Sequence, residues 1–236
     1  MNPLTLILIM FFANFTQSVA GFGMALVAVP LLSEIIGPQA TAPLIPLAAL
    51  VTQTVLLLRY RTAINLRTVA RLAAAAIVAI PLGVFVLTRA DEDTIRAVLG
   101  VVLILYALYA LFNLRLPALR SPRWAYGFGF VSGLLSGAYN IPGPPVVIYG
   151  NCKGWPPGEF RSNLQGFFML SSVMVLATHA LARHYTPDVF QMFVTVLPGI
   201  LLGLGAGIAL DRFINPALFR RVVLVLLIAL GLNLIF

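Results

Sequence analysis

The sequence predicts an all-α integral membrane protein made of two inverted repeats, each a broken or re-entrant helical hairpin followed by three transmembrane helices. Three observations lead to this fold class. Hydrophobic residues make up 61% of the 236 residues and charged residues only 9%, whereas soluble domains carry about 25% charged residues. Eight apolar stretches are long enough to span a bilayer. Two of these stretches are interrupted by glycine and proline.

The apolar stretches follow one another with short connections, which leave no room for a soluble domain. They lie at about residues 4–32, 41–58, 68–88, 95–113, 124–150, 163–181, 189–210 and 217–235. The first stretch contains Gly21-Phe22-Gly23, and the fifth contains the segment from Asn140 to Pro145. Glycine loosens a helix and proline removes a backbone donor, so each of these stretches should break in the middle.

The basic residues support a hairpin at each break. If all eight stretches crossed the membrane, the basic residues would divide eight to seven between its two faces. If the first and fifth stretches fold back instead, twelve basic residues share one face and three the other. The positive-inside rule then makes the first face cytoplasmic, with both chain termini outside. Interfacial helices in place of hairpins would give the same division.

Under this topology the chain has a first membrane repeat at residues 1–113, a cytoplasmic linker at 114–123 and a second membrane repeat at 124–236. Each repeat holds three spans after its hairpin, and because three is odd the second repeat is inverted. Similar caps open the last helix of each repeat: Asp91 in the first, and Asn215 followed by Pro216 in the second. Small residues in the preceding helices should allow close helix packing.

Paired broken helices are the best sequence indicator of a transport site, and here they are residues 14–32 and 131–150. The half-helices after Gly23 and Gly143 should present unpaired N–H groups and a positive dipole end to an anion. Close helix packing alone is the alternative explanation of these glycines. The candidate substrate-binding residues are Asn14, Gln17, Ser18, Gly21 and Gly23 in the first segment, with Ser136, Tyr139, Asn140 and Gly143 in the second.

Four further polar residues lie in helices that follow the hairpins. Gln53, Asn163 and Gln165 could contact the substrate or could equally form interhelical hydrogen bonds. Arg161 could bind the substrate or anchor its helix at the membrane interface. All four are therefore kept as candidate substrate-binding residues beside their structural alternatives.

Three segments carry a family resemblance. They read GFGMALVAVPLL at 21–32, GLLSG at 133–137 running on to GPPVVIY at 143–149, and FRSN at 160–163. Together they resemble the sulfite exporter TauE/SafE family along nearly the whole chain. The resemblance implies a secondary transporter that exports sulfite, sulfonates or related organosulfur anions. Met24, Asn140 and Pro142 stand where the family usually has glycine, which points to altered substrate contacts.

Composition also bounds the other function classes. All seven acidic residues lie in predicted loops or at helix ends, so coupling through a buried carboxylate is not expected. No cluster of residues suits catalysis, a metal or another cofactor, and no enzyme activity is expected. The net charge of +8 comes from loops that flank the membrane and does not indicate nucleic-acid binding. The expected location is the cell membrane, multi-pass. The expected partners are a small anion, the lipid bilayer and a second copy in a homodimer. A membrane subunit or a channel that works with a partner protein is the alternative function.

Overall fold

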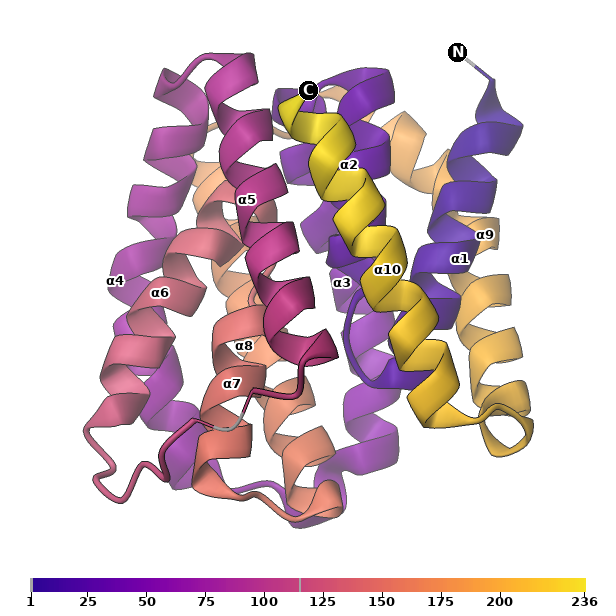
Figure 1. Ribbon diagram of the computed structural model, residues 1–236. Helices are drawn as coiled ribbons and strands as arrows, with labels where there is room; N and C mark the ends of the chain where they lie inside the picture. Colours follow the sequence, from indigo (N-terminus) through magenta and orange to yellow (C-terminus); the bar gives the residue numbers. More distant parts are fainter. Residues whose placement is uncertain (1, 115) are drawn as a thin grey trace. The chain divides into compact units, whose positions relative to one another are not determined.

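The computed structural model describes residues 2–114 and 116–236, which are mostly helical and contain no β-strand (Figure 1). The helices in chain order are α1 (Pro3–Ala20), α2 (Met24–Ile36), α3 (Pro38–Tyr60), α4 (Leu66–Arg89), α5 (Glu92–Leu111), α6 (Trp124–Tyr139), α7 (Gly143–Lys153), α8 (Pro157–Leu181), α9 (Pro187–Leu210) and α10 (Pro216–Ile235). Short 3₁₀ turns, η1 (Arg61–Ala63) and η2 (Asp211–Phe213), follow α3 and α9.

Several of these helices can span a membrane. Within the described residues, seven are long and apolar enough to do so, namely α1, α3, α4, α5, α8, α9 and α10. Their outer faces expose large apolar side chains such as Leu105 on α5 and Leu202 on α9, as lipid contact requires. The prediction of an all-α, multi-pass membrane protein is therefore confirmed.

Both predicted helix breaks are present. The first apolar stretch divides into α1 and α2, and the fifth divides into α6 and α7. In Figure 1, α2 turns back along α1 instead of continuing its course. Helix α7 has 11 residues, a length of about 16 Å, which is about half of the apolar thickness of a bilayer. A helix this short reaches only part of the way across.

Both predicted helix caps are also present. The side chain of Asp91 accepts a hydrogen bond from the Thr94 N–H at 2.8 Å and so caps α5. Asn215 caps α10 by accepting from the N–H groups of Ala217 at 3.0 Å and Leu218 at 3.2 Å. Each side chain satisfies donors that the first turn of its helix leaves open.

Contacts divide the chain into two compact units, each of which contains one hairpin. Unit 1 comprises residues Met1–Ala48, Ala90–Leu114 and Thr186–Phe236, and unit 2 comprises Ala49–Arg89 and Arg115–Tyr185. Unit 1 thus holds the α1–α2 hairpin with α5, α9 and α10, and unit 2 holds the α6–α7 hairpin with α4 and α8. The first residues of α1 and the last residues of α10 lie at the same end of unit 1 (Figure 1). Each unit combines helices from both halves of the sequence, while the division into two inverted repeats stays a prediction.

Each hairpin packs against a helix from the other half of the chain, and glycine makes the contact close. In unit 1, α9 turns Gly199 and Gly203 toward the carbonyl oxygens of Ile7 and Phe11 on α1. In unit 2, α6 packs on α4 in the same way through Gly129, Gly133 and Gly137. A Cβ atom at any of these positions would overlap the partner backbone. The expected close packing through small residues is confirmed.

Candidate substrate site at the two helix breaks

The first break depends on two glycines with left-handed backbone geometry. Gly21 has φ 81° and donates its N–H to the Gln17 carbonyl oxygen at 2.9 Å, which ends α1. Gly23 has φ 117° and precedes the first turn of α2. Residues with a Cβ atom rarely adopt these φ values, so both positions favour glycine.

Gln17 connects the two helices of this hairpin. Its Oε1 accepts a hydrogen bond from the backbone N–H of Met24, the first residue of α2, at 2.9 Å. Because an N–H must donate to an oxygen, this bond identifies Oε1, and the other terminal atom of the carboxamide is therefore the donor Nε2. The side chain is only 2% exposed, and Nε2 has no hydrogen-bond acceptor among the described residues. A buried amide N–H without a partner is costly, which marks this position for a ligand or a water molecule.

Two other candidate residues of α1, Asn14 and Ser18, have structural partners. Asn14 Nδ2 donates to the Met10 carbonyl oxygen at 2.8 Å. Ser18 Oγ donates to the Asn14 carbonyl oxygen at 2.9 Å and lies 3.4 Å from the Leu204 carbonyl oxygen on α9. Both side chains are buried. These bonds hold α1 in place, whereas Gln17 offers a donor that has no acceptor among the described residues.

The second break is built differently. Asn140 adopts a left-handed conformation with φ 53° and donates its N–H to the Ser136 carbonyl oxygen at 2.7 Å, which ends α6. Ser132 Oγ donates to the Pro142 carbonyl oxygen at 2.7 Å and ties the turn back to α6. Asn140 is 4% exposed, and its Oδ1 has no hydrogen-bond donor within the described part of the chain.

The N-termini of the two half-helices are poorer in free donors than we expected. Pro144 and Pro145 follow Gly143 in the first turn of α7, and proline has no N–H. The N–H of Met24 in α2 is already bonded to Gln17. Side-chain amides therefore supply polar groups at the breaks in addition to the backbone N–H groups that remain in the first turns.

Four more candidates are buried in unit 2. Ser136 Oγ donates to the Ser132 carbonyl oxygen at 2.6 Å and accepts from Ser171 Oγ on α8 at 2.9 Å. Tyr139, Gln53 and Gln165 are buried as well. Gln53 Oε1 has no donor among the described residues. Ser132 and Ser171 were not anticipated, although Ser132 lies one helical turn before Ser136 and so on the same face of α6.

The two candidates near the start of α8 bind parts of unit 2. Asn163 Oδ1 accepts from the backbone N–H of Asn65 at 2.7 Å, and its Nδ2 donates to Glu159 Oε1 at 3.3 Å. These bonds hold the α3–α4 connection against α8, so the contacts of Asn163 agree with its structural alternative. Arg161 Nη1 donates to the Tyr60 hydroxyl at 3.3 Å.

The candidate residues thus gather into two groups, one in each unit. Gln17, Gly21 and Gly23 surround the α1–α2 break, together with Asn14 and Ser18. In unit 2, Ser136, Tyr139, Asn140 and Gly143 lie at the α6–α7 break, and Gln53 and Gln165 are buried on α3 and α8.

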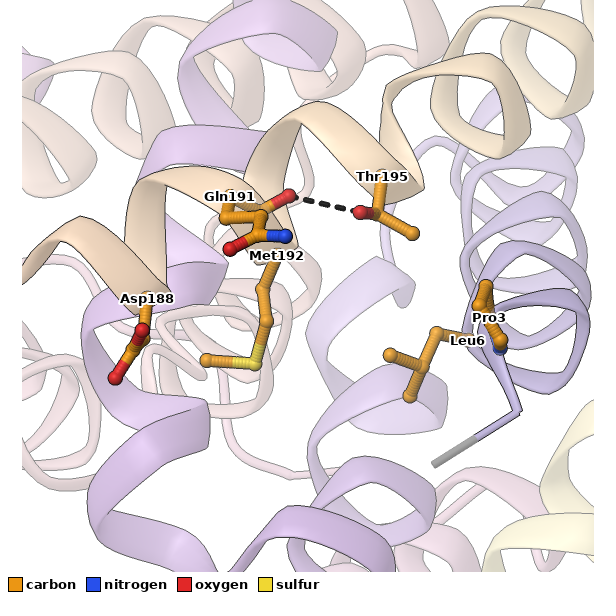
Figure 2. Close-up of a pocket in the computed structure, with 6 residues that line it drawn as sticks. All are labelled: Pro3, Leu6, Asp188, Gln191, Met192 and Thr195. Carbon is orange, nitrogen blue, oxygen red and sulfur yellow. Dashed lines mark hydrogen bonds between the residues drawn. The ribbon is translucent and has the colours of Figure 1, made fainter.

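A pocket of about 290 Å³ in unit 1 lies away from these residues (Figure 2). It is lined by Pro3 and Leu6 of α1 and by Asp188, Gln191, Met192 and Thr195 of α9. Leu6 and Gln17 are separated by about 16 Å along the axis of α1. In Figure 2 the Thr195 hydroxyl points to the Gln191 carbonyl oxygen, to which it donates at 2.8 Å. This pocket contains none of the candidate residues.

The acidic residues lie in loops and at helix ends, as the sequence predicts. All seven lie in loops, in 3₁₀ turns or in the first or last turn of a helix, and none lies beside a helix break. The breaks thus combine buried amides and hydroxyls with no acidic side chain, an arrangement that can hold an anion without a competing negative charge.

Seven helices long and apolar enough to span a membrane, together with a broken hairpin in each unit, define a polytopic membrane protein within the described residues. The family model "Sulfite exporter TauE/SafE" matches residues 6–234, and the chain belongs to this family of transporters. It is therefore a multi-pass protein of the cell membrane and not an enzyme.

One curated relative was found by comparison of sequences. The chain is 26% identical over 230 residues to a protein of Cupriavidus necator (strain H16) named "Probable sulfite/organosulfonate exporter TauE", with 94% of this chain and 89% of the relative covered. No solved structure matches the chain.

Proposed function

We propose that the protein is a secondary transporter that exports small sulfur-containing anions, such as sulfite or organosulfonates, and that the two broken hairpins supply the contacts to the substrate. Family membership and the name of the curated relative support this substrate class. The two hairpins would belong to inverted repeats, as they do in other secondary transporters.

One observation carries the proposal: the buried Nε2 of Gln17 is held in place yet has no acceptor in the described structure. A sulfonate or sulfite oxygen can accept this hydrogen bond. Because the anion is charged, such a bond is worth about 1.5–3 kcal/mol.

Export of an anion needs no coupling ion, since a negative-inside potential drives it outward. A potential of about 100 mV is worth about 2.3 kcal/mol for one charge, or a gradient of about fortyfold for a monovalent anion. This agrees with the absence of carboxylates beside the breaks.

The test is uptake into proteoliposomes made with the purified protein. Sulfite, a small sulfonate and sulfate should be compared under an imposed potential of either sign. We expect saturable movement of sulfite or the sulfonate that follows the potential. Movement without saturation would favour a channel, and no movement of any of them would refute the proposed substrate class.

An Asn140→Gly variant tests the site. Glycine tolerates φ 53°, so this change removes the carboxamide while it leaves the backbone unstrained. Asn113→Gly is the matched control, because Asn113 has φ 49° and lies in an exposed loop. Transport should fall in the first variant and be unchanged in the control; equal transport in both folded variants would exclude Asn140 from the site.

A further inference from the structure

A cluster of two arginines and a tyrosine lies in unit 2, where α3 ends and α8 begins. Arg59 Nε and Arg161 Nη1 each donate to the Tyr60 hydroxyl oxygen at 3.3 Å. Their guanidinium groups also lie over the Tyr60 ring, 5.6 Å and 5.4 Å from its centroid. Two positive charges from different helices therefore meet at one phenol oxygen.

The backbone around this cluster is fixed by several bonds. The Ser162 hydroxyl donates to the Tyr60 carbonyl oxygen, and Asn163 Oδ1 accepts from the Asn65 N–H at 2.7 Å. The end of α3 and the following connection are thus tied to the first turns of α8. Such anchoring keeps Arg59 and Arg161 close to each other despite their repulsion.

The charged residues of unit 2 are mostly basic. The sequence segments of unit 2 contain eleven basic residues and one acidic residue, Glu159. Oε1 of Glu159 already accepts from the side-chain amides of Asn65 and Asn163, each at 3.3 Å. Two like charges held together in a positive environment favour the binding of an anion, because an anion would relieve the repulsion.

We propose that Arg59, Tyr60 and Arg161 form a recruitment site for a sulfur oxyanion, the sulfite or sulfonate group of the substrate. This inference rests on the proposed function and extends it to a second site, outside the helix breaks. The planar donors of guanidinium suit such an oxyanion. The Tyr60 hydroxyl, now an acceptor, can rotate to donate to it. A lipid phosphate presents the same chemistry, so the experiment must separate the two sources.

The experiment uses the full-length protein in nanodiscs of neutral lipid, with ethanesulfonate as the probe. Trp155 is a natural reporter, because its ring lies 6.0 Å from that of Phe160, the neighbour of Arg161. Replacing the exposed Trp124 by phenylalanine leaves Trp155 as the one tryptophan. Binding is then followed by fluorescence.

We expect Arg161→Gln and Arg59→Gln each to weaken binding roughly five- to tenfold, with the difference shrinking at high salt. Arg161→Lys should restore part of the affinity, because it keeps the charge and loses the planar donors. Arg67→Gln is the matched control, because Arg67 is an exposed arginine in the first turn of α4 and the proposed site does not include it. This variant should bind as the parent does. Equal affinity in all folded variants, or an equal loss in the control, would overturn the recruitment site.

Nanodiscs that contain phosphatidylglycerol identify the source of the oxyanion. If the site holds lipid, this lipid will compete with ethanesulfonate in the parent protein but not in Arg161→Gln, and the substrate assignment is overturned. If the site recruits substrate, the affinity for ethanesulfonate is the same in both lipid compositions. In proteoliposomes, the arginine variants then raise KM by about the same factor by which they weaken binding, while the maximal rate is unchanged. A parent protein that binds ethanesulfonate but does not transport it would refute the proposed function while leaving the site intact.

Discussion

Replacement of Gln17 separates its structural role from its proposed role in binding. Oε1 accepts from the Met24 N–H at 2.9 Å, and Nε2 is directed at no acceptor among the described residues. Gln17→Leu deletes both groups. Gln17→Glu keeps the acceptor, and it keeps a donor as well, but only while the new carboxyl group is protonated.

The structure sets the expected magnitudes. Gln17→Leu removes a hydrogen bond to a buried backbone amide, which should lower the free energy of unfolding by about 1–3 kcal/mol. Loss of the donor to an anionic substrate, worth about 1.5–3 kcal/mol, should reduce kcat/KM by about 10- to 150-fold. Gln17→Glu should transport a sulfonate at acidic pH and lose this activity as the pH rises, since the carboxylate has no donor and repels the anion.

The assays are potential-driven sulfonate uptake into proteoliposomes between about pH 5 and 8 and thermal unfolding in detergent. Thr54→Ala is the control, because this exposed hydroxyl donates to the Leu50 carbonyl oxygen of its own helix, at 2.7 Å. A folded Gln17→Leu protein with the kcat/KM of the parent would refute the reasoning. So would a Gln17→Glu protein whose transport does not change with pH.

Three further predictions concern packing, capping and specificity. A Cβ at Gly133 would lie 2.7 Å from the Ala76 Cα atom, so Gly133→Val should lower the free energy of unfolding by about 1–3 kcal/mol, as measured by thermal unfolding. Gly127→Val on the same helix should lower it little, because a Cβ at Gly127 would meet no neighbouring atom of the described residues within 4 Å. Hydrogen bonds from Thr94 lower the pKa of Asp91 from its usual 3.8. The ionised Asp91 side chain therefore stabilises the fold above that pH, and this stabilisation is lost as the pH falls through the lowered pKa. In unfolding experiments, the stability difference between the parent and Asp91→Ala should shrink below about pH 4. In competition uptake, the parent should prefer an amino-substituted sulfonate over the same chain without the amine. Asn140→Gly should reduce this preference, because Asn140 Oδ1 is a buried acceptor at the break that has no donor among the described residues. An unchanged preference would contradict that role.

Local features of the fold could be predicted from the sequence, and long-range features could not. Helix breaks and helix caps depend on residues that are close in the chain, so composition and spacing indicate them. Examples are the breaks at Gly21-Phe22-Gly23 and at Asn140, and the caps Asp91 and Asn215. The pairing of α9 with α1 and of α4 with α6 joins opposite halves of the sequence. The glycine spacing indicated close packing, but it did not identify the partner helices.

The same distinction applies to the candidate site. Gln17 and Asn140 were found because they are amides beside a break, but the bond from Met24 to Gln17 depends on how α2 turns back, which no local pattern reports. The Tyr60 contacts of Arg161 likewise join residues far apart in the sequence. The scarcity of donors at the start of α7 could have been predicted, because Pro144 and Pro145 are visible in the sequence and proline has no N–H.

The two hairpins solve the same problem with opposite chemistry. A broken helix in a membrane must satisfy the backbone groups that the break releases. In unit 1 the side chain of Gln17 accepts from a backbone N–H and retains an unused donor, Nε2. In unit 2 the Ser132 hydroxyl donates to a backbone carbonyl oxygen, and the unused group is an acceptor, Asn140 Oδ1. The donor in unit 1 suits the oxygens of an anion, whereas the acceptor in unit 2 suits a substrate O–H or N–H. A substrate contact at Asn140 would therefore favour protonated sulfite or an amino-substituted sulfonate over an anion such as sulfate that, when fully ionised, has only acceptors.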